Sequence, residues 1–499
     1  MADSSTPTLL PCGLINAANR YLSAEPFRFQ VVATGLVLRP RQVWVLRFVS
    51  PQGAGAAGHD EERGQRLHLL SSLKRFLAAD PNGKVTCDQE SPGPGALFLL
   101  RQYPDGKVSL QCELTQRYLG GAEDNVTCFA QTVSEGEKWS LQLAQHPNVH
   151  LLNPGKQRYL RCDQQTGHLR CDRDLPWGPE AVLTLHFDLK VKRYGLQTGA
   201  GTLLATDGSL QAEQSPQTLY CLELRGGLLA LRDADGRYVT GREGIVKTFK
   251  TDKPGRDELF ALEPSVAQVS LRTFAGGRYV SCRAGSDVYA NASAVGNTEI
   301  FQLLLNDVTK QACFRSSSGT YLAVGPKDAV VSTSALDKGV WFSLQYQAQK
   351  VMLRTADGRY MATRPNGQLL VVPEVAGKEE FLLLLVNRPL LILQSEAGFV
   401  GLFPGTRRLD GNRPTYDAST LMFSETGLCH FRVANKYWSL DKDGLIMADG
   451  DHPSDFILQF VSSSCLVLKA PNNKYLVAEA GGRLWAGASD AASATLFHY

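Results

Sequence analysis

One glycine-rich segment of the sequence has the spacing of a nucleotide-binding loop. Gly53, Gly55 and Gly58 match Gly-x-Gly-x-x-Gly, which holds a dinucleotide pyrophosphate where a strand turns into a helix. The strand-like VWVLRFV precedes it, but the HDEERGQR that follows is charged on all sides and contains a glycine. Because the motif needs a helix at that point, we interpret the segment as an inserted surface loop.

A second segment has the spacing of a helical zinc pair. In HPNVH, His146 and His150 stand four residues apart, but the glutamate of His-Glu-x-x-His is missing. Pro147 also disfavours the interior of a helix, so we interpret both histidines as non-ligands. None of the nine histidines has a nucleophile or a paired carboxylate nearby in the sequence. We therefore expect no catalytic centre, no metal and no cofactor.

The eleven cysteines are odd in number and form no Cys-x-x-Cys pair. A disulfide framework or a thiolate metal site would need paired spacings. We therefore expect reduced thiols that pack in the core.

The elements that carry these residues repeat along the chain. The pentapeptide Ala-Asp-Gly-Arg-Tyr occurs at 234–238 and again at 356–360. Asp-Gly favours a two-residue hairpin, and the tyrosine two positions later would then point inward. Looser forms recur about every 40 residues, which predicts twelve repeats. Their first anchors are Tyr21, Phe76, Tyr118, Tyr159, Leu203, Tyr238, Tyr279, Tyr321, Tyr360, Phe399, Tyr437 and Tyr475.

A second anchor near the end of the repeat is expected to be buried as well. It follows the first by roughly two dozen residues or slightly fewer. The second anchors that the sequence identifies are Trp44, Phe98, Trp139, Phe260, Phe301, Phe342, Phe381 and Phe497.

Between the anchors, short runs such as VSLQC and VMLRT alternate apolar and polar residues. This alternation predicts strands, and no sustained helical stripe interrupts it, so the fold class is all-β. Twelve units exceed the four to eight blades of a usual propeller. Three four-stranded repeats can instead close as a β-trefoil without an open edge. We expect four tandem β-trefoil domains, at 1–141, 142–263, 264–384 and 385–499.

Trefoils often bind carbohydrate, and lectin-type trefoils commonly carry Gln-x-Trp in each repeat. In this chain Gln42, Val43 and Trp44 form the single match. One match in twelve repeats is what a core tryptophan after a glutamine would give by chance. A glycan-binding module therefore remains an alternative, but no repeated motif in the sequence supports it.

Bulk charge does not indicate nucleic-acid binding. The chain has 52 Lys and Arg against 49 Asp and Glu, a formal net charge of +3, which is too small for a sequence-independent phosphate binder. The amino terminus lacks the basic start and apolar stretch of a signal peptide, and runs such as FLLLLV are too short to span a bilayer. We expect a cytoplasmic protein without membrane insertion.

Local basic charge is stronger than the total. The segment GREGIVKTFKTDKPGRDELF contains Arg242, Lys247, Lys250, Lys253 and Arg256 in what we expect to be a long loop. Such runs are usually solvated faces, but loops also concentrate binding residues. Basic patches on several domains favour a protein that grips acidic surfaces at more than one point.

The chain as a whole resembles the fascin family of actin-bundling proteins, which are built from four tandem β-trefoils. The segments that carry the resemblance are GLIN, NRYLSAEPFRF, YLGGAEDNVTCFAQTVSEGEKWS, DRDLPWG, GRDELFALE, NGQL, LVNRPLLIL and LDGNRPTYD. The resemblance implies that one monomer ties parallel actin filaments into tight bundles of the filopodial, microvillar or stereociliar type, through at least two filament-binding surfaces.

The resemblance also implies which residues contact actin. A first surface, between the first and fourth domains, would comprise Arg20, Arg39, Arg41, Glu396, Lys469 and Lys474. A second, on the second domain, would comprise Arg225, Lys247, Lys250, Lys253 and Arg256. A third would comprise Arg359 and Arg364, with Arg117 on the first domain.

The chain departs from the family pattern at several of these places. Val37 stands where a regulatory serine is expected, and valine has no hydroxyl to phosphorylate. Gln30, Leu228 and Val477 stand where the family often has lysine. These losses favour the alternative of a non-bundling trefoil module that binds one protein partner or a glycan.

Overall fold

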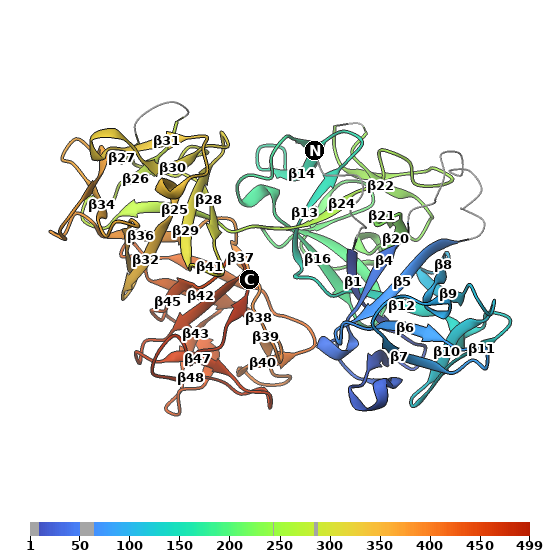
Figure 1. The fold of residues 1–499 in the computed structure, drawn as a ribbon. Helices are drawn as coiled ribbons and strands as arrows, with labels where there is room; N and C mark the ends of the chain where they lie inside the picture. The colour runs from blue at the N-terminus through green and yellow to red at the C-terminus, as the bar shows by residue number, and fades with distance from the viewer. Residues whose placement is uncertain (1–8, 50–63, 243, 284–287) are drawn as a thin grey trace. The chain divides into compact units, whose positions relative to one another are not determined.

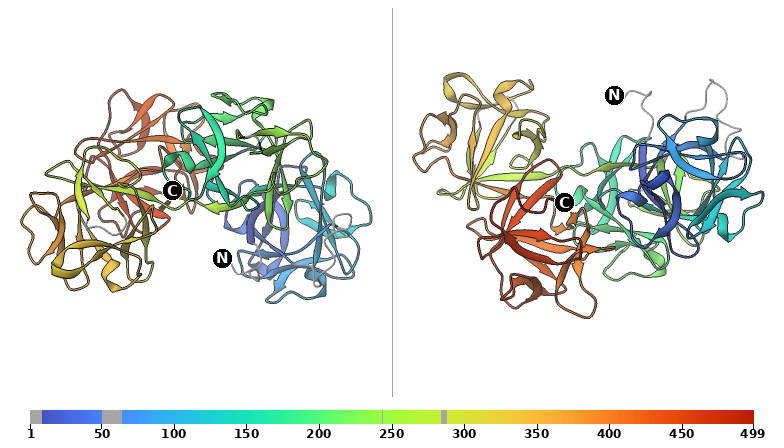
Figure 2. Two further views of the ribbon diagram at one scale, coloured as in Figure 1. Left: turned by 90° about the horizontal axis from the view of Figure 1, so that it is seen from above. Right: turned by 60° about the horizontal axis from the view of Figure 1, so that its bottom comes forward.

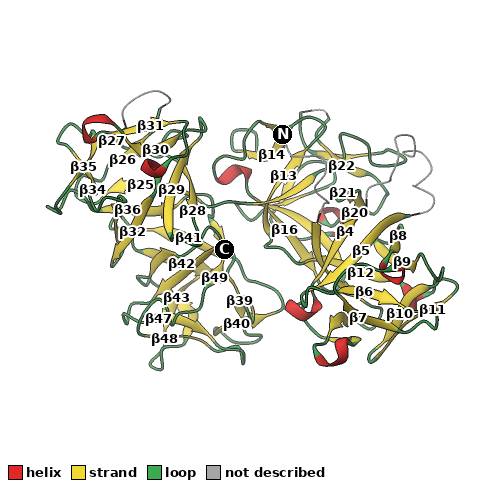
Figure 3. Ribbon diagram, in the orientation of Figure 1, coloured by secondary structure: helices red, strands yellow, loops and turns green. Residues whose placement is uncertain are grey.

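Strands make up almost all of the regular structure (Figures 1 and 3). The computed structural model describes residues 9–49, 64–242, 244–283 and 288–499. Gly53, Gly55 and Gly58 lie outside these ranges. The helices within them are short 3-10 turns: η1 Phe27–Phe29, η2 Pro40–Gln42, η3 Pro94–Ala96, η4 Glu135–Glu137, η5 Pro179–Ala181, η6 Pro216–Thr218, η7 Pro326–Asp328 and η8 Lys338–Val340. The predicted all-β class is confirmed.

None of the helices in the described ranges has the length and the apolar character to cross a bilayer.

The first twelve strands form one antiparallel sheet. They are β1 Leu9–Ile15, β2 Tyr21–Ala24, β3 Val31–Gly35, β4 Trp44–Phe48, β5 Gln65–Ser71, β6 Phe76–Ala79, β7 Val85–Gln89, β8 Phe98–Gln102, β9 Lys107–Cys112, β10 Tyr118–Ala122, β11 Asn125–Ala130 and β12 Trp139–Leu143. The last strand returns to the first, because Cys12 of β1 pairs with Leu143 of β12.

The next twelve strands repeat this plan in two sheets. They are β13 Asn148–Asn153, β14 Arg158–Asp163, β15 His168–Arg173, β16 Leu183–Asp188, β17 Arg193–Thr198, β18 Leu203–Leu204, β19 Leu210–Gln211, β20 Cys221–Arg225, β21 Leu228–Arg232, β22 Tyr238–Thr240, β23 Lys247–Phe249 and β24 Ala261–Pro264. Val149 of β13 pairs with Pro264 of β24 and closes the set.

The third set again has twelve strands in one sheet. They are β25 Gln268–Thr273, β26 Tyr279–Ser281, β27 Tyr289–Ala292, β28 Phe301–Leu305, β29 Gln311–Ser316, β30 Tyr321–Val324, β31 Val330–Thr333, β32 Phe342–Gln347, β33 Lys350–Arg354, β34 Tyr360–Thr363, β35 Leu369–Val372 and β36 Phe381–Leu385. Val269 of β25 pairs with Leu385 of β36.

The fourth set has one strand more, because its first strand is broken into two short pieces. Its strands are β37 Leu390–Leu391, β38 Gln394–Ser395, β39 Gly398–Leu402, β40 Leu409–Arg413, β41 Ser419–Phe423, β42 Cys429–Val433, β43 Lys436–Leu440, β44 Ile446–Gly450, β45 Ile457–Phe460, β46 Cys465–Lys469, β47 Tyr475–Ala478, β48 Leu484–Ala488 and β49 Phe497–His498. Gln394 of β38 pairs with His498 of β49.

Four sets, each closed by pairing of its first and last strands, are four tandem β-trefoils. This closure pairs the first and last strands with each other, so that these two strands do not present a free edge to another chain on that side. We propose the expected bounds of 1–141, 142–263, 264–384 and 385–499 for these trefoils; each internal bound falls near the end of a closing strand, β12, β24 or β36.

The second anchors are buried as expected. All eight are at most 1% exposed. The indole Nε1 of Trp44 donates to the Leu22 carbonyl at 3.0 Å, and Trp139 repeats this bond with Leu119 at 3.0 Å. The apolar body of each tryptophan thus fills the core while its polar atom is satisfied.

The first anchors are a different case, and the prediction that all of them are buried is wrong. Seven are only half-buried: Tyr159, Tyr279, Tyr321, Tyr360, Phe399, Tyr437 and Tyr475. The next residue fills the core in every repeat and is at most 3% exposed: Leu22, Leu77, Leu119, Leu160, Leu204, Val239, Val280, Leu322, Met361, Val400, Trp438 and Leu476. Adjacent side chains of a strand occupy opposite faces of the sheet, so each half-buried first anchor lies on the face opposite to the buried residue that follows it.

The Ala-Asp-Gly-Arg-Tyr turn is also longer than the predicted two-residue hairpin. Arg232 pairs with Tyr238, so five residues make the connection. Gly236 has φ +80° and donates its N–H to the Asp233 carbonyl at 3.2 Å, and the Asp233 N–H donates to the Arg237 carbonyl at 2.8 Å. Asp235 is absent from the positive-φ residues, whereas a two-residue Asp-Gly turn would need both residues there.

The described chain divides into two compact units. The first contains residues 1–174, 183–198 and 202–264, and the second contains 175–182, 199–201 and 265–499. Each unit has its own continuous hydrophobic core. Figure 2 shows the strands of both units from two further sides.

Neighbouring trefoils inside a unit are joined by buried polar contacts. In the first unit, Gln102 of β8 accepts from the Leu224 N–H at 2.6 Å and donates to the Leu224 carbonyl at 2.7 Å. In the second unit, the Ser463 hydroxyl accepts from the Leu305 N–H at 3.0 Å and donates to the Leu305 carbonyl at 3.1 Å. A side chain that completes the backbone bonds of a strand in the next trefoil fixes their orientation.

Candidate functional site

The predicted contact residues divide between the two units. The first unit carries Arg20, Arg39, Arg41, Arg117, Arg225, Lys247, Lys250, Lys253 and Arg256. The second carries Arg359, Arg364, Glu396, Lys469 and Lys474. Each unit is therefore considered by itself.

The first trefoil presents Arg39 and Arg41 on the short turn η2. Gln42 holds this turn: its side chain accepts from the Arg39 N–H at 3.2 Å and donates to the Ser23 hydroxyl at 2.8 Å. Both arginine side chains are exposed, and Arg41 lies 3.1 Å from the Glu25 carboxylate. A rigid turn that projects cations is suited to an acidic partner.

Arg20 belongs to the turn before β2 and is half-buried. Its N–H donates to the Asn16 side-chain oxygen at 2.9 Å, so its backbone position is fixed. Val37, at the expected phosphorylation position, is half-buried in the segment between β3 and η2.

The basic segment of the second trefoil differs from the expected long loop. Lys247 lies in β23, where it pairs with Thr240. Lys250, Lys253 and Arg256 follow the strand and are exposed. The strand therefore positions the first cation, and a loop of ten residues between Lys250 and Leu259 carries the others.

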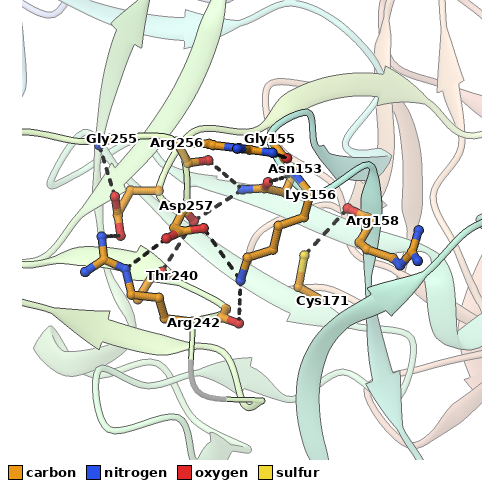
Figure 4. Close-up of polar contacts among 12 residues, drawn as sticks. Asn153, Gly155, Lys156, Arg158, Cys171, Thr240, Arg242, Gly255, Arg256 and Asp257 are labelled. Atoms are coloured by element: carbon orange, nitrogen blue, oxygen red, sulfur yellow. Dashed lines mark hydrogen bonds and ion pairs between the residues drawn. The ribbon is translucent and has the colours of Figure 1, made fainter.

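A buried carboxylate anchors this loop (Figure 4). Glu258 is fully buried and accepts from the Gly255 N–H at 3.0 Å. Arg242 lies 3.0 Å from the same carboxylate and also donates to Asp257 at 3.0 Å. Because an unpaired buried carboxylate would be costly, these contacts hold the loop in one conformation.

A second set of contacts joins the loop to the turn after β13. The side-chain amide of Asn153 donates to three loop carbonyls, those of Arg256, Asp257 and Leu259, at 3.1, 3.3 and 3.2 Å. Lys156 lies 3.7 Å from the Asp257 carboxylate and donates to the Gly241 carbonyl at 3.0 Å.

Arg256 is oriented by the same turn. Its Nε donates to the Gly155 carbonyl at 2.8 Å. A Cβ on Gly155 would lie 2.1 Å from the Arg256 side chain, so glycine is required for this approach. Arg256 is thus exposed but fixed, and Lys250, at the start of the same loop, is exposed as well.

Arg225 of β20 is already engaged within the trefoil. It lies 2.8 Å from Glu223, and the Tyr238 hydroxyl donates to the same carboxylate at 2.8 Å. The Arg225 side chain is 29% exposed, so part of its charge is compensated before any partner arrives.

Arg359 of the third trefoil is paired more completely. It contacts Asp357 at 2.8 Å and also pairs with Asp328. The hydrogen bond from Arg359, together with that from Thr355, lowers the pKa of Asp357 to about 2. Arg364, in contrast, is exposed and donates to Gln368 at 3.1 Å.

Arg364 also lines an open cavity of about 410 Å³ in the third trefoil. Arg278, Lys378 and Glu380 also line this cavity. Lys350 lies 2.8 Å from Glu380 and compensates its charge. The cavity is therefore lined by more uncompensated positive than negative charge.

Arg117 of the first trefoil stacks on an exposed ring. Its guanidinium lies 4.8 Å from the centroid of Phe129, which is 57% exposed. An arginine on an aromatic face keeps its charge available while its plane is held.

In the fourth trefoil, Lys469 ends β46 and its ammonium lies 5.7 Å from the Tyr475 ring. Lys474 is exposed in the following turn, where its N–H donates to Asn472 at 3.1 Å. Glu396 is exposed after β38. These elements share one sheet, in which β49 pairs with both β38 and β46.

The residues that the sequence offered for zinc binding and for sugar binding are not placed for these roles. His150 is buried in β13, and the His146 ring nitrogen accepts from the Asn148 N–H at 3.2 Å. Within the described ranges, no three His, Cys, Asp or Glu side chains gather as a metal site. Trp44 is fully buried, so it offers no stacking surface to a sugar.

The sequence did not identify the residues that hold the basic loop. Asn153, Lys156 and Glu258 came from no motif, and Arg242 was read only as part of a charged run. A pattern could have indicated Glu258: a glutamate three residues after Gly255 at the end of a loop can accept the glycine N–H.

Four segments of the chain, residues 18–141, 156–262, 275–384 and 406–499, match a family model described as "Fascin domain". The chain is 35% identical to Fascin-2 of Mus musculus over 491 residues, which cover 98% of this chain and 97% of that protein. It is 36% identical to Fascin-2 of Homo sapiens over 495 residues, 98% and 97% of the two chains. It is 31% identical to Fascin of Strongylocentrotus purpuratus over 506 residues, 98% of each chain.

Proposed function

Because the chain belongs to the fascin family, we propose that it cross-links actin filaments and ties parallel filaments into tight bundles. One monomer would use at least two basic surfaces. The observation that carries the proposal is that four family domains span the chain and that exposed cations project from fixed turns in both units.

The first proposed surface would use Arg20, Arg39 and Arg41 of the first trefoil. It would also use Lys469, Lys474 and Glu396 of the fourth trefoil. The second-trefoil surface would use Lys247, Lys250, Lys253, Arg256 and Arg225. Arg364, Arg359 and Arg117 would complete a third. Actin filaments are acidic, so these cations would steer association and supply much of the attraction, with screening by salt.

The degree of internal pairing ranks these residues. Arg41, Arg225 and Arg359 already face carboxylates, and a partner must compete with those contacts. Arg39, Lys250 and Arg364 are exposed, and none of the ion pairs described above includes them. We propose that these three contribute the most to actin binding.

The protein would act as a monomer in the cytoplasm, within the filopodial, microvillar or stereociliar type of bundle. It would be a structural protein rather than an enzyme, with no cofactor. Nucleic acid and membrane are not among its proposed partners.

Paired charge reversals test the proposal. We expect Arg39→Glu with Arg41→Glu, and separately Lys250→Glu with Lys253→Glu, to abolish the pelleting of filaments at low centrifugal force. Each pair should lower filament affinity at least about tenfold, which corresponds to about 1.4 kcal/mol. High-force pelleting at raised protein concentration should persist, because the other surface remains.

Lys442→Glu is the matched control, since Lys442 is an exposed lysine outside the proposed surfaces. It changes the net charge in the same direction and should leave bundling intact. If Lys442→Glu weakened bundling as much as the paired reversals, net charge alone would govern association and the proposed surfaces would be wrong.

A single-site module is the second candidate. The observation that favours it is the loss of lysine at Gln30, Leu228 and Val477, together with the internal pairing of Arg225 and Arg359. Such a protein would bind one protein partner or a glycan. It would either sediment with filaments only at high centrifugal force or not bind them at all, and in both cases filaments would not pellet at low force.

A further inference from the structure

One cysteine of the fourth trefoil faces a histidine across the sheet. Cys465 of β46 pairs directly with His498 of β49, so both side chains project from the same side. The Cys465 sulfur lies 3.4 Å from the His498 Nδ1. The neighbouring pair, Leu466 and Phe497, is fully buried in the core, so Cys465 and His498 project from the opposite face; His498 is exposed, whereas Cys465 is only 7% exposed.

The surroundings favour a thiolate at this position. Burial opposes ionisation of Cys465, but hydrogen bonds from His498 and Ser462 outweigh it and hold the pKa of the thiol below its ordinary value. The bond to Cys465 raises the pKa of His498, and the charge of Glu396 acts in the same direction. The hydroxyl of Tyr499 and the guanidinium of Arg388 above its ring are the other titratable groups near the pair.

The pKa of one other thiol, Cys112, is also lowered, to about 5, chiefly by its hydrogen bond with Cys128, but the Cys112 side chain is fully buried. All eleven are free thiols. Cys171 is more exposed than Cys465, but burial of its sulfur raises the pKa to about 11. Cys12 and Cys429 are fully buried and their pKa values are also raised by burial. The Cys465 sulfur contacts the exposed residues Ser464 and His498, and rotation of these two surface side chains would open it to a small disulfide.

We propose that Cys465 and His498 form a reactive thiolate–imidazolium pair, and that Cys465 is a site of mixed-disulfide formation with small disulfides such as oxidised glutathione. The Cys465 sulfur attacks one sulfur of the disulfide, a new S–S bond forms, and the original S–S bond breaks. The departing thiolate accepts a proton from the His498 imidazolium. Cys465 is oxidised and the departing thiol is reduced, so no further oxidant is required.

The inference does not depend on actin binding and can be tested on the purified full chain. The protein is incubated with oxidised glutathione at pH 7, and the modified fraction of each cysteine is followed by peptide mass spectrometry. We expect Cys465 to react at least about tenfold faster than Cys171, because the thiolate is the nucleophile. A rate for Cys465 no greater than that for Cys171 would overturn the proposal.

Two further measurements isolate the histidine. His498→Gln should slow the reaction of Cys465 about tenfold, whereas His430→Gln, which alters another surface histidine of the fourth trefoil, should leave it unchanged. In the unsubstituted protein, the rate of Cys465 should reach its plateau at a lower pH than the rate of Cys171. Equal rates in the two histidine variants, or coincident pH profiles, would contradict the assigned role of His498.

Discussion

At the scale of single residues, Arg359 and Asp357 form a pair whose strength is directly measurable. Arg359 holds the pKa of Asp357 at about 2, below the ordinary value of 3.8. A carboxylate with a lowered folded-state pKa contributes stability above its unfolded pKa and loses that contribution as the pH falls through the folded value. The contribution of this pair is therefore present at neutral pH and disappears between pH 4 and pH 2.

We expect Arg359→Gln to raise the pKa of Asp357 toward 3.8. Carboxyl carbon chemical shifts followed by NMR across an acid titration would measure the change. Arg364→Gln is the control, because Arg364 bonds to Gln368 and not to Asp357. An unchanged Asp357 titration in Arg359→Gln would mean that the ion pair does not form in solution.

Glu258 makes the second prediction at this scale. Arg242→Gln would leave the buried Glu258 carboxylate without its cation, and the loop would lose about 1–3 kcal/mol of local stability. Hydrogen exchange of peptides that contain 250–260 should accelerate about tenfold or more. Arg237→Gln serves as the control, because Arg237 pairs with Asp233 and Asp235 elsewhere in the trefoil. Unchanged exchange in Arg242→Gln would show that Gly255 alone satisfies Glu258.

At the scale of strands, the revised position of the core residue can be tested within one repeat. Leu160 is fully buried, whereas the half-buried Tyr159 directs its hydroxyl to Glu263 at 2.9 Å. We expect Leu160→Ala to destabilise the second trefoil by about 2–5 kcal/mol. Tyr159→Phe should cost only about 1 kcal/mol, because it removes one hydrogen bond and no core volume.

Urea unfolding of the two variants gives the comparison. The prediction made from the alternation alone would give the opposite order, because it assigned the core position to the tyrosine. A larger loss for Tyr159→Phe than for Leu160→Ala would restore that assignment and would contradict the core position of Leu160.

The repeats and the fold class could be predicted from the sequence because the second anchors and the glycine-containing turns recur about every 40 residues. The half-buried positions of seven first anchors could not. Adjacent side chains of a strand occupy opposite faces of the sheet, and the sequence has a large apolar side chain on both faces, as at Tyr159 and Leu160. Alternation alone therefore does not decide which of the two faces the core.

The candidate site was predictable to a similar degree. The cations are visible in the sequence, but some of their partners are distant in it: Arg256 bonds to Gly155, 101 residues away, and Arg359 pairs with Asp328, 31 residues away. Arg225 and Arg359 also pair with carboxylates two residues away, Glu223 and Asp357. The sequence therefore indicated the basic surfaces, and the structure distinguishes Lys250 and Arg364 from Arg225 and Arg359.

At the scale of the whole molecule, bundling requires that one monomer hold two filaments. Each unit supplies fixed turns with exposed cations, and polar contacts such as that of Gln102 with Leu224 keep the trefoils of a unit in register. We expect Gln102→Ala to loosen the first unit by about 1–3 kcal/mol, because the Leu224 N–H loses its side-chain acceptor, whereas the Leu224 carbonyl keeps its bond from Gln65 at 2.7 Å. Hydrogen exchange in β20 would measure this loss, with exchange in β33 of the other unit as the internal control. Equal protection of β20 in the variant would contradict it.

The most direct test of the central claim is sedimentation of actin filaments with the unsubstituted protein, at low and at high centrifugal force, over a series of salt concentrations. The account predicts that filaments pellet at low force as parallel bundles, that electron microscopy shows close and regular packing, and that the effect fades as salt screens the basic surfaces. Filaments that pellet with the protein only at high force would show a single binding surface. If the protein never pelleted with filaments, the β-trefoil fold would stand, but actin bundling would not be its function.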